Sequence, residues 1–178
     1  MCEPDAEPRP AEPPGWRRAS EAGLTFRPIT DADLPFLARV YASTRTEELA
    51  PVPWSDEQKA AFCEAQFKAQ HAHYRQTYQG ADWLMILHHG EPVGRLYVIE
   101  WEREYRVIDI ALVPEHRRQG LGTAVMLDLL DRAAADRKAV SIHVEQFNPA
   151  QRLYQRLGFS KIGEHGVYEL MRCLPRPI

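Results

Sequence analysis

The sequence has no excess of basic residues, few cysteines and no long apolar run. Lys and Arg together number 22 against 25 Asp and Glu, which gives a formal net charge of −3, whereas a general nucleic-acid binder is expected to be basic. The three cysteines, Cys2, Cys63 and Cys173, are odd in number and lack the spacing of a zinc site or a disulfide framework. No apolar stretch reaches the roughly 20 residues that cross a bilayer. We therefore expect a cytoplasmic protein that binds neither nucleic acid nor a membrane.

The N-terminal segment is rich in proline and acidic residues and lacks the basic-then-apolar order of a secretory signal. Such a composition buries too little apolar surface to offset the conformational entropy lost on ordering. We predict a mobile, proline-rich tail over residues 1–22 and one globular domain over residues 23–178, because the length suits a single domain.

Apolar spacing along the rest of the chain predicts an α+β fold built on one mixed, mostly antiparallel sheet. Apolar runs predict strands over residues 24–29, 82–88, 92–100, 106–113 and 139–144, with two short strands after Phe159. Helical spacing and N-cap signals predict helices over residues 30–43 and 55–78, a third helix from Gly120, and a fourth from Asn148 to Gly158.

The segment 113–123, Val-Pro-Glu-His-Arg-Arg-Gln-Gly-Leu-Gly-Thr, joins a predicted strand to a predicted helix. Glycine there lets the backbone approach a ligand closely, and the free N–H groups of a helix N-terminus carry partial positive charge, which favours a phosphate. A P-loop would need a Gly-Lys-Ser/Thr ending, and a dinucleotide fingerprint would need a small residue at Val125, so both are excluded. A glycine-rich turn with solvated arginines is the alternative.

Two motifs resemble the GCN5-related N-acetyltransferase (GNAT) superfamily. The sequence Arg117-x-x-Gly120-x-Gly122 matches the superfamily's signature Arg/Gln-x-x-Gly-x-Gly/Ala after a strand. Residues 148–159 are similar to its Asn-x-x-Ala-x-x-Leu-Tyr-x-x-x-Gly-Phe helix, with one residue dropped from the first spacing. Together with the predicted strand order, the resemblance covers residues 24–172. It implies a GNAT-like sheet flanked by helices, with a splayed cofactor-binding strand.

The resemblance further implies an N-acetyltransferase that uses acetyl-coenzyme A and no metal. Acetyl would pass directly to a primary amine of a small molecule, peptide or protein. Loop amides would bind the pyrophosphate of coenzyme A, with Arg118 as a side-chain phosphate contact, and the preceding strand would bond its pantetheine arm. The implied cofactor-binding residues are Leu112, Val113, Arg117, Arg118, Gln119, Gly120, Leu121, Gly122, Thr123, Asn148 and Tyr154. A non-catalytic domain that binds acyl-coenzyme A as a sensor or partner module is the alternative, and a homodimer is left open.

Acetyl transfer to an amine needs a base for the amine and an acid for the departing thiolate. A lysine-like amine has a pKa of ~10.4 and is mostly protonated at neutral pH, so a carboxylate or a water that it holds must take its proton. Among carboxylates on or after the predicted strands, Asp109 ranks before Glu100, with Glu145 as a third candidate. The resemblance turns Tyr154 toward the cofactor sulfur, which makes it the candidate acid; packing against coenzyme A is its alternative role.

The acceptor amine is expected between the first two helices, which form the variable part of the superfamily. Near Arg45, the side chains of Glu47 and Glu48 could attract a cation, and Trp54 could supply an apolar or cation–π wall. Helix-end glutamates are also commonly only solvated. A metal site at His71 and His73 is not expected, because residues two apart on a helix face different directions.

Overall fold

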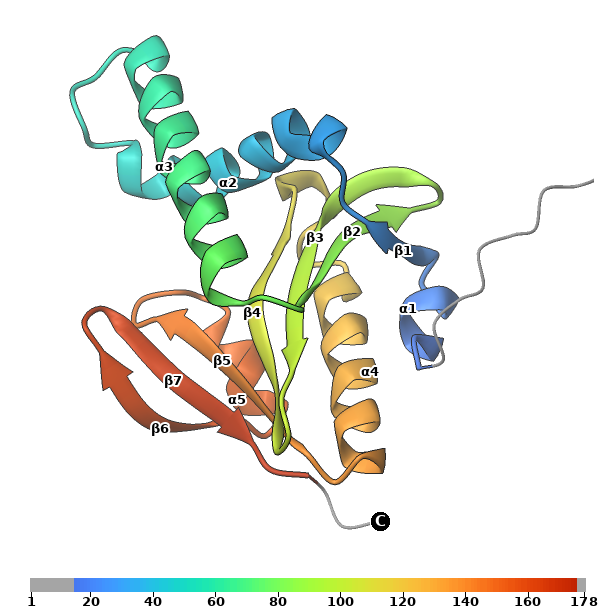
Figure 1. Ribbon diagram of the computed structural model, residues 1–178. Helices are drawn as coiled ribbons and strands as arrows, with labels where there is room; N and C mark the ends of the chain where they lie inside the picture. Colours follow the sequence, from blue (N-terminus) through green and yellow to red (C-terminus); the bar gives the residue numbers. More distant parts are fainter. Residues whose placement is uncertain (1–14, 176–178) are drawn as a thin grey trace, which may run out of the picture.

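The computed structural model describes residues 15–175, and in this part of the chain seven strands form one sheet (Figure 1). The sheet order is β1-β2-β3-β4-β5-β7-β6, and every neighbouring pair is antiparallel except β4 with β5. The predicted mixed, mostly antiparallel sheet is therefore confirmed. The strands are β1 (Leu24–Pro28), β2 (Asp82–His88), β3 (Glu91–Glu100), β4 (Glu104–Leu112), β5 (Ala139–Glu145), β6 (Ser160–His165) and β7 (Tyr168–Cys173).

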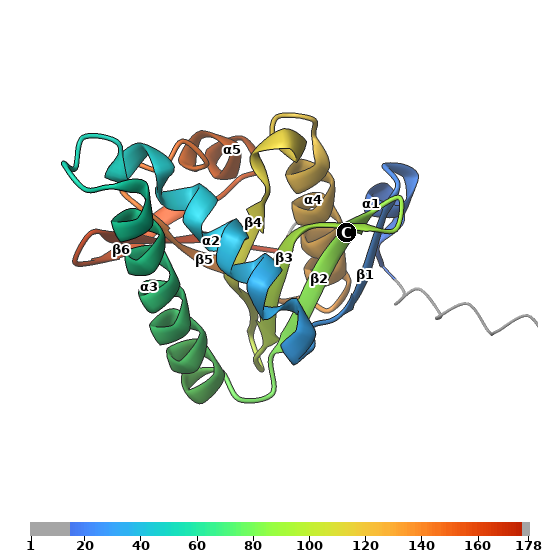
Figure 2. The same cartoon turned by 90° about the horizontal axis from the view of Figure 1, so that it is seen from above.

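Helices cover both faces of the sheet, and Figure 2 shows the two helical layers from above. On one face lie α1 (Arg17–Glu21), α4 (Leu121–Ala135) and α5 (Gln151–Arg156), and on the other lie α2 (Leu34–Leu49) and α3 (Asp56–Thr77). Two single 3₁₀ turns, η1 (Asp31–Asp33) and η2 (Pro114–His116), precede α2 and α4. The central strand β3 is consequently buried on both sides, with Leu96 packed toward α4 and Tyr97 toward α3.

The two parallel strands β4 and β5 separate after four paired residues. Pairing runs from Glu104–Ala139 to Val107–Ile142 and stops there. Beyond that point β4 stays paired with β3 as far as Leu112, while β5 stays paired with β7. The register of β3 and β4 shifts at this place, which leaves Ile108 as an extra residue, and such a β-bulge bends and twists its strand. The predicted splayed strand is thus present.

A close approach of backbones keeps β3 and β4 together beside this gap. A Cβ atom on Gly94 would lie 2.2 Å from the carbonyl oxygen of Ala111, which no side chain could tolerate. Only glycine fits at this position, and it permits the pairing of β4 to continue up to the loop that follows Leu112.

The predicted helices are confirmed, with differences in their limits. The capping box of Ser55 and Gln58 starts α3 as predicted. Helix α2 runs to Leu49, past the predicted end at residue 43, because no proline interrupts the chain before Pro51. Helix α5 begins at Gln151, later than the predicted start at Asn148, and Asn148 Oδ1 instead accepts a hydrogen bond from Ala150 N at 2.9 Å. Among the described residues, no helix combines the length and hydropathy needed to cross a membrane.

The predicted limit of the tail at residue 22 is wrong for its last part, while residues 1–14 lie outside the described residues. Trp16 is only 7% exposed and Ala19 is fully buried in the core under α4. The Trp16 ring lies 4.4 Å from that of Phe26 on β1. The sequence pattern missed this because a single helical turn gives too few residues for a periodic signal, and its partners are far along the chain.

The attachment of α1 depends on one buried carboxylate on α4. Asp128 accepts hydrogen bonds from the backbone N–H groups of Arg18 (3.1 Å) and Ala19 (2.9 Å) and from the Arg18 guanidinium (3.1 Å). Its side chain is 2% exposed, whereas that of Asp131, which also pairs with Arg18, is 64% exposed.

We predict that Asp128→Ala lowers the free energy of unfolding by about 2–3 kcal/mol, because it leaves two backbone donors without an acceptor. Asp131→Ala is the matched control and should cost less than about 1 kcal/mol, since its pair is solvated. Urea denaturation of both variants measures the difference, and equal losses would contradict the role given to Asp128.

Candidate active site

The loop between β4 and α4 presents an open helix N-terminus. Gly120 is the N-cap residue, has the left-handed φ of 78° and offers no side chain to cap the helix. The first helical hydrogen bond is donated by Ala124 N to Gly120 O at 2.9 Å. The N–H groups of Leu121, Gly122 and Thr123 therefore have no acceptor within α4. These three donors and the positive end of the helix dipole suit a phosphate group.

Neighbouring side chains hold this loop in shape. Arg117 donates to the carbonyl oxygen of Leu112 and to Ser43 Oγ on α2, both at 2.8 Å, and Gln119 donates to Glu115 O at 2.7 Å. Arg117 and Gln119 thus use their side chains within the protein. Arg118 is exposed and has a φ of 59°, a left-handed conformation that is uncommon for a residue with a Cβ. Its side chain is the loop cation most available to a ligand.

The edge of β4 that faces the gap carries backbone groups for a second contact. Val113 N donates to Val93 O at 2.8 Å, so residue 113 points its hydrogen-bonding groups toward β3. Because these directions alternate along an antiparallel strand, the N–H groups of Leu112 and Ile110 point away from β3 toward the gap. The two residues predicted to bind the cofactor arm therefore differ. The Val113 N–H is bonded to β3, whereas the Leu112 N–H has the orientation required to bind an extended ligand arm.

Tyr154 enters the same region from α5. Its ring is 5% exposed and packs 5.7 Å from the ring of Phe159. Burial, and after it the negative charge of Asp109, raises the pKa of the Tyr154 hydroxyl above the usual range of a phenol. The raised pKa keeps Tyr154 protonated and able to donate.

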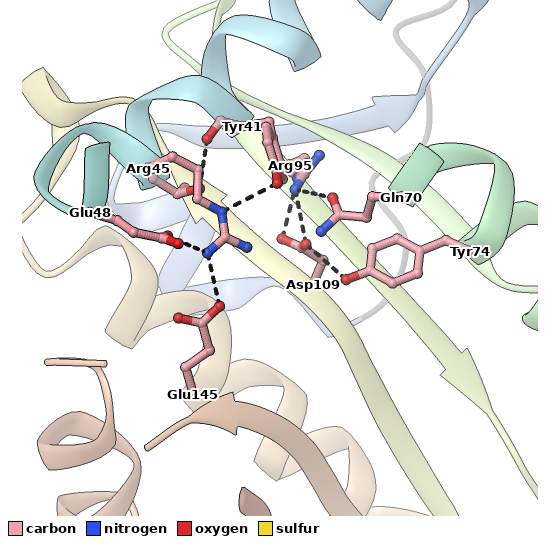
Figure 3. A network of polar contacts seen from close by, with 9 residues as sticks. Tyr41, Arg45, Glu48, Gln70, Tyr74, Arg95, Asp109 and Glu145 are labelled. Atoms are coloured by element: carbon pink, nitrogen blue, oxygen red, sulfur yellow. Dashed lines mark hydrogen bonds and ion pairs between the residues drawn. The ribbon is translucent and has the colours of Figure 1, made fainter. Parts of the chain in front are cut away.

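Asp109 lies in a buried ion pair that the sequence did not reveal. The Arg95 guanidinium, whose side chain is 2% exposed, donates to both carboxylate oxygens of Asp109, at 2.9 and 3.2 Å (Figure 3). Gln70 Oε1 accepts from Arg95 at 3.0 Å, and the Tyr74 hydroxyl lies 3.5 Å from Asp109 Oδ2. Burial and the Asp109 charge raise the pKa of Tyr74. This carboxylate is anchored on both oxygens and is poorly placed to take up a proton.

A second cluster of charges surrounds Arg45 on α2, and Figure 3 shows it beside the first. One guanidinium nitrogen of Arg45 donates to Glu48 at 2.9 Å and to Glu145, at the end of β5, at 3.0 Å. Another lies 3.3 Å from the Tyr41 hydroxyl. The two clusters meet through Phe67, whose ring is 6.2 Å from that of Tyr41 and 6.0 Å from the Arg95 guanidinium carbon.

The Arg45 cluster forms the polar part of a groove of about 400 Å³ between α2, α3 and the end of β5. Its lining residues are Tyr41, Arg45, Glu48, Leu49, Phe62, Gln66, Glu145, Gln146, Phe147, Val167 and Tyr168. A larger apolar groove of about 560 Å³ lies between α2 and α3, but none of the candidate catalytic or cofactor residues lines it. The smaller groove is therefore the candidate acceptor site.

The structure does not bring every predicted residue to this place. Glu100 ends β3 six residues beyond Gly94, at the opposite end of the strand from the cofactor loop, roughly 20 Å along a β-strand. It pairs there with Lys138 at 2.5 Å. Glu47 is exposed outside the groove lining, and Trp54 reaches the groove only through Phe62, with ring centroids 5.3 Å apart. The side-chain oxygen of Asn148 accepts a hydrogen bond within its own turn.

Sequence reasoning missed Arg95 and the convergence of Arg45 with Glu145. A weak signal existed for Arg95, because a lone arginine inside the apolar run of β3 needs a buried partner and Asp109 is an acidic residue of the next strand. No comparable signal linked Arg45 to Glu145, which lies 100 residues later.

An open helix N-terminus beside a gap between two strands suits a ligand that carries a phosphate group and an extended arm. Residues 39–159 match the sequence profile of the acetyltransferase (GNAT) family, so the chain belongs to this family. No curated protein matches the sequence significantly.

Solved structures show the same fold at low sequence identity. The PaiA N-acetyltransferase of Thermoplasma acidophilum, in complex with coenzyme A, is 15% identical, with a TM-score of 0.64 over 85% of this chain and 98% of that one. An acetyltransferase of Thermus thermophilus is 19% identical, with a TM-score of 0.60 over 85% and 96%. The ribosomal-protein-S18-alanine N-acetyltransferase of Escherichia coli is 20% identical, with a TM-score of 0.55 over 87% and 96%.

We predict that Gly120→Val abolishes binding of coenzyme A, because a branched side chain at φ 78° is strained and covers the open N–H groups. Gly122→Ala is the matched control: it lies within α4, where an added Cβ meets no atom within 4 Å, and alanine favours a helix by about 1 kcal/mol. Calorimetric titration should find binding lost only in the first variant. Unchanged binding by a folded Gly120→Val protein would contradict the phosphate site.

Proposed function

We propose that this chain is an N-acetyltransferase that moves acetyl directly from acetyl-coenzyme A to a primary amine of a small molecule or peptide. The observation that carries the proposal is the gap between β4 and β5, which opens beside an uncapped helix N-terminus, a protonated phenol and a groove with two carboxylates. Bound acetyl-coenzyme A would supply the acetyl thioester. A reaction without metal, in the cytoplasm, is part of the proposal.

The cofactor would be held by groups that the loop already presents. The N–H groups at residues 121–123 and the exposed Arg118 side chain fit a pyrophosphate, and the N–H of Leu112 fits an amide of the extended arm. The N–H of Ile110, two residues earlier on the same edge of β4, has the direction needed to polarise a carbonyl in the gap. Arg117 supports these contacts by fixing the Leu112 carbonyl and α2.

Tyr154 would donate its hydroxyl proton to the sulfur that leaves when the amine nitrogen bonds to the acetyl carbon. Its burial beside Asp109 supports this role, because the raised pKa keeps the proton on the phenol through neutral pH. Asp109 would act by position and charge, since its own oxygens are engaged by Arg95.

Glu145 would take the proton that the amine nitrogen loses. One of its oxygens accepts from Arg45, and its side chain is 39% exposed in the groove. Its backbone carbonyl accepts from Gln151 on α5, the helix that carries Tyr154 one turn later, so the proposed base and acid are fixed to each other. We therefore propose Glu145 in the role for which the sequence ranked Asp109 first.

The overall test measures coenzyme A release with a thiol reagent across a panel of amines. Release that depends on an amine is expected. Tight binding of acetyl-coenzyme A without release for any acceptor would contradict the enzyme and favour an acyl-coenzyme A sensor.

We predict that Tyr154→Phe lowers turnover by at least ~100-fold, the lower range for general acid catalysis, while the affinity for acetyl-coenzyme A is kept because the ring stays in place. Turnover at saturating substrate and calorimetric titration separate the two effects. A drop of only a few-fold would leave Tyr154 a packing role.

We predict that Glu145→Gln also lowers turnover at neutral pH by ~100-fold or more. The loss in turnover should shrink as pH rises. Below the pKa of the amine, each increase of one pH unit raises the fraction of neutral amine about tenfold, so less help from a base is needed. Glu48→Gln, on the same arginine, is the control and should raise the acceptor KM more than it changes kcat. A pH–rate profile of Glu145→Gln equal to that of the parent would contradict the assignment of Glu145 as the base.

Asp109→Asn should mainly destabilise the fold, by about 3–5 kcal/mol, because it leaves Arg95 buried without its charge partner.

A further inference from the structure

The mouth of the acceptor groove gathers exposed apolar side chains. Among residues 15–175, eight large hydrophobic residues are exposed, and four of them line this groove: Phe62, Phe147, Val167 and Tyr168. A fifth, Trp54, packs on Phe62. These side chains come from the α2–α3 connection, α3, the β5–α5 connection and the β6–β7 turn. Such a gathering on a water-soluble surface marks a site that contacts an apolar partner.

A backbone hydrogen bond joins two of the connections that carry these exposed apolar side chains. Gln146 N donates to Val167 O at 2.9 Å, which ties the β5–α5 connection to the β6–β7 turn. Phe147 is 96% exposed and Val167 is 63% exposed, so both side chains are available while their backbones are fixed. Tyr168, the first residue of β7, is 39% exposed and lines the groove beside them.

The charges inside the groove match a single cation. Arg45 is shared by Glu48 and Glu145, so one positive and two negative groups leave an excess of one negative charge. The two amide side chains of the lining, Gln66 on α3 and Gln146 after β5, are neutral. One ammonium group would balance this excess, whereas a polyamine would bring additional charges that find no partner among the lining residues.

We propose, on the basis of the proposed function, that the acceptor is a small primary monoamine whose amino group is attached to an aromatic or branched aliphatic body. Its ammonium group would lie between Glu145 and Glu48, and its body would pack against Phe62, Phe147 and Val167. The groove volume of about 400 Å³ suits a molecule of this size.

The first arm of the test compares acceptors with acetyl-coenzyme A as donor. The value of kcat/KM for 2-phenylethylamine should exceed that for ethanolamine, spermidine and an alanine-initiated peptide by at least tenfold. This factor corresponds to burial of about half of an aromatic side chain's transfer free energy.

The second arm uses Phe147→Ser and Val167→Ser. Each should raise the KM for 2-phenylethylamine by about three- to tenfold and should lower the kcat/KM for 2-phenylethylamine by a larger factor than that for ethanolamine, which has no apolar body. Ile162→Ser is the matched control, because Ile162 is 46% exposed on β6 but does not line the groove. All three sites are exposed, so the melting temperature should change little.

The outcomes separate this inference from the proposed function. A preference for spermidine, ethanolamine or the peptide, or equal KM changes in Phe147→Ser and Ile162→Ser, would overturn the inference and leave the acetyltransferase in place. Absence of turnover with every amine, while acetyl-coenzyme A still binds, would overturn both.

Discussion

The separation of β4 from β5 is the constraint on which the rest of the molecule depends. The two strands pair over four residues and then follow different partners, β4 with β3 and β5 with β7. The bulge at Ile108 lies one residue beyond the last pair, and bulges bend the strand that carries them. Because the strands part, backbone N–H groups of β4 face an opening in which Tyr154, the α4 N-terminus and the Arg45 groove converge.

The two ion-pair clusters beside this gap contain similar side chains but differ in burial and in charge balance. Arg95 and Asp109 satisfy each other in a buried, bidentate pair, so their contribution is a fixed geometry under α3. Arg45 is shared by two carboxylates that reach solvent, which leaves the cluster with an excess negative charge. The two clusters therefore differ in burial and in net charge: the first is a closed pair, and the second has carboxylates that are open to solvent.

Membership of the acetyltransferase (GNAT) family explains the loop and the sheet, which this chain shares with solved structures of 15–20% identity. The groove is lined by residues of α2, α3, the end of β5, the β5–α5 connection, the β6–β7 turn and the start of β7. The long helix α3, the extension of α2 to Leu49 and the bond between the β5–α5 connection and the β6–β7 turn set its walls. Four exposed apolar side chains, Phe62, Phe147, Val167 and Tyr168, lie on these walls.

The sequence by itself determined the features that depend on neighbouring residues. The N-cap signal at Ser55 and the glycine motif before α4 are local, because turns and caps form between residues a few positions apart. Most of the strand order followed from the same patterns and from the family resemblance. Tertiary structure alone decided that Arg95 binds Asp109, that Glu100 lies at the far end of β3, that Arg45 meets Glu145 and that Trp16 belongs to the core. The ion pairs among these contacts join residues up to 100 positions apart. Packing of the whole sheet and its helices decides which side chains meet, and a pattern of neighbouring residues does not show this.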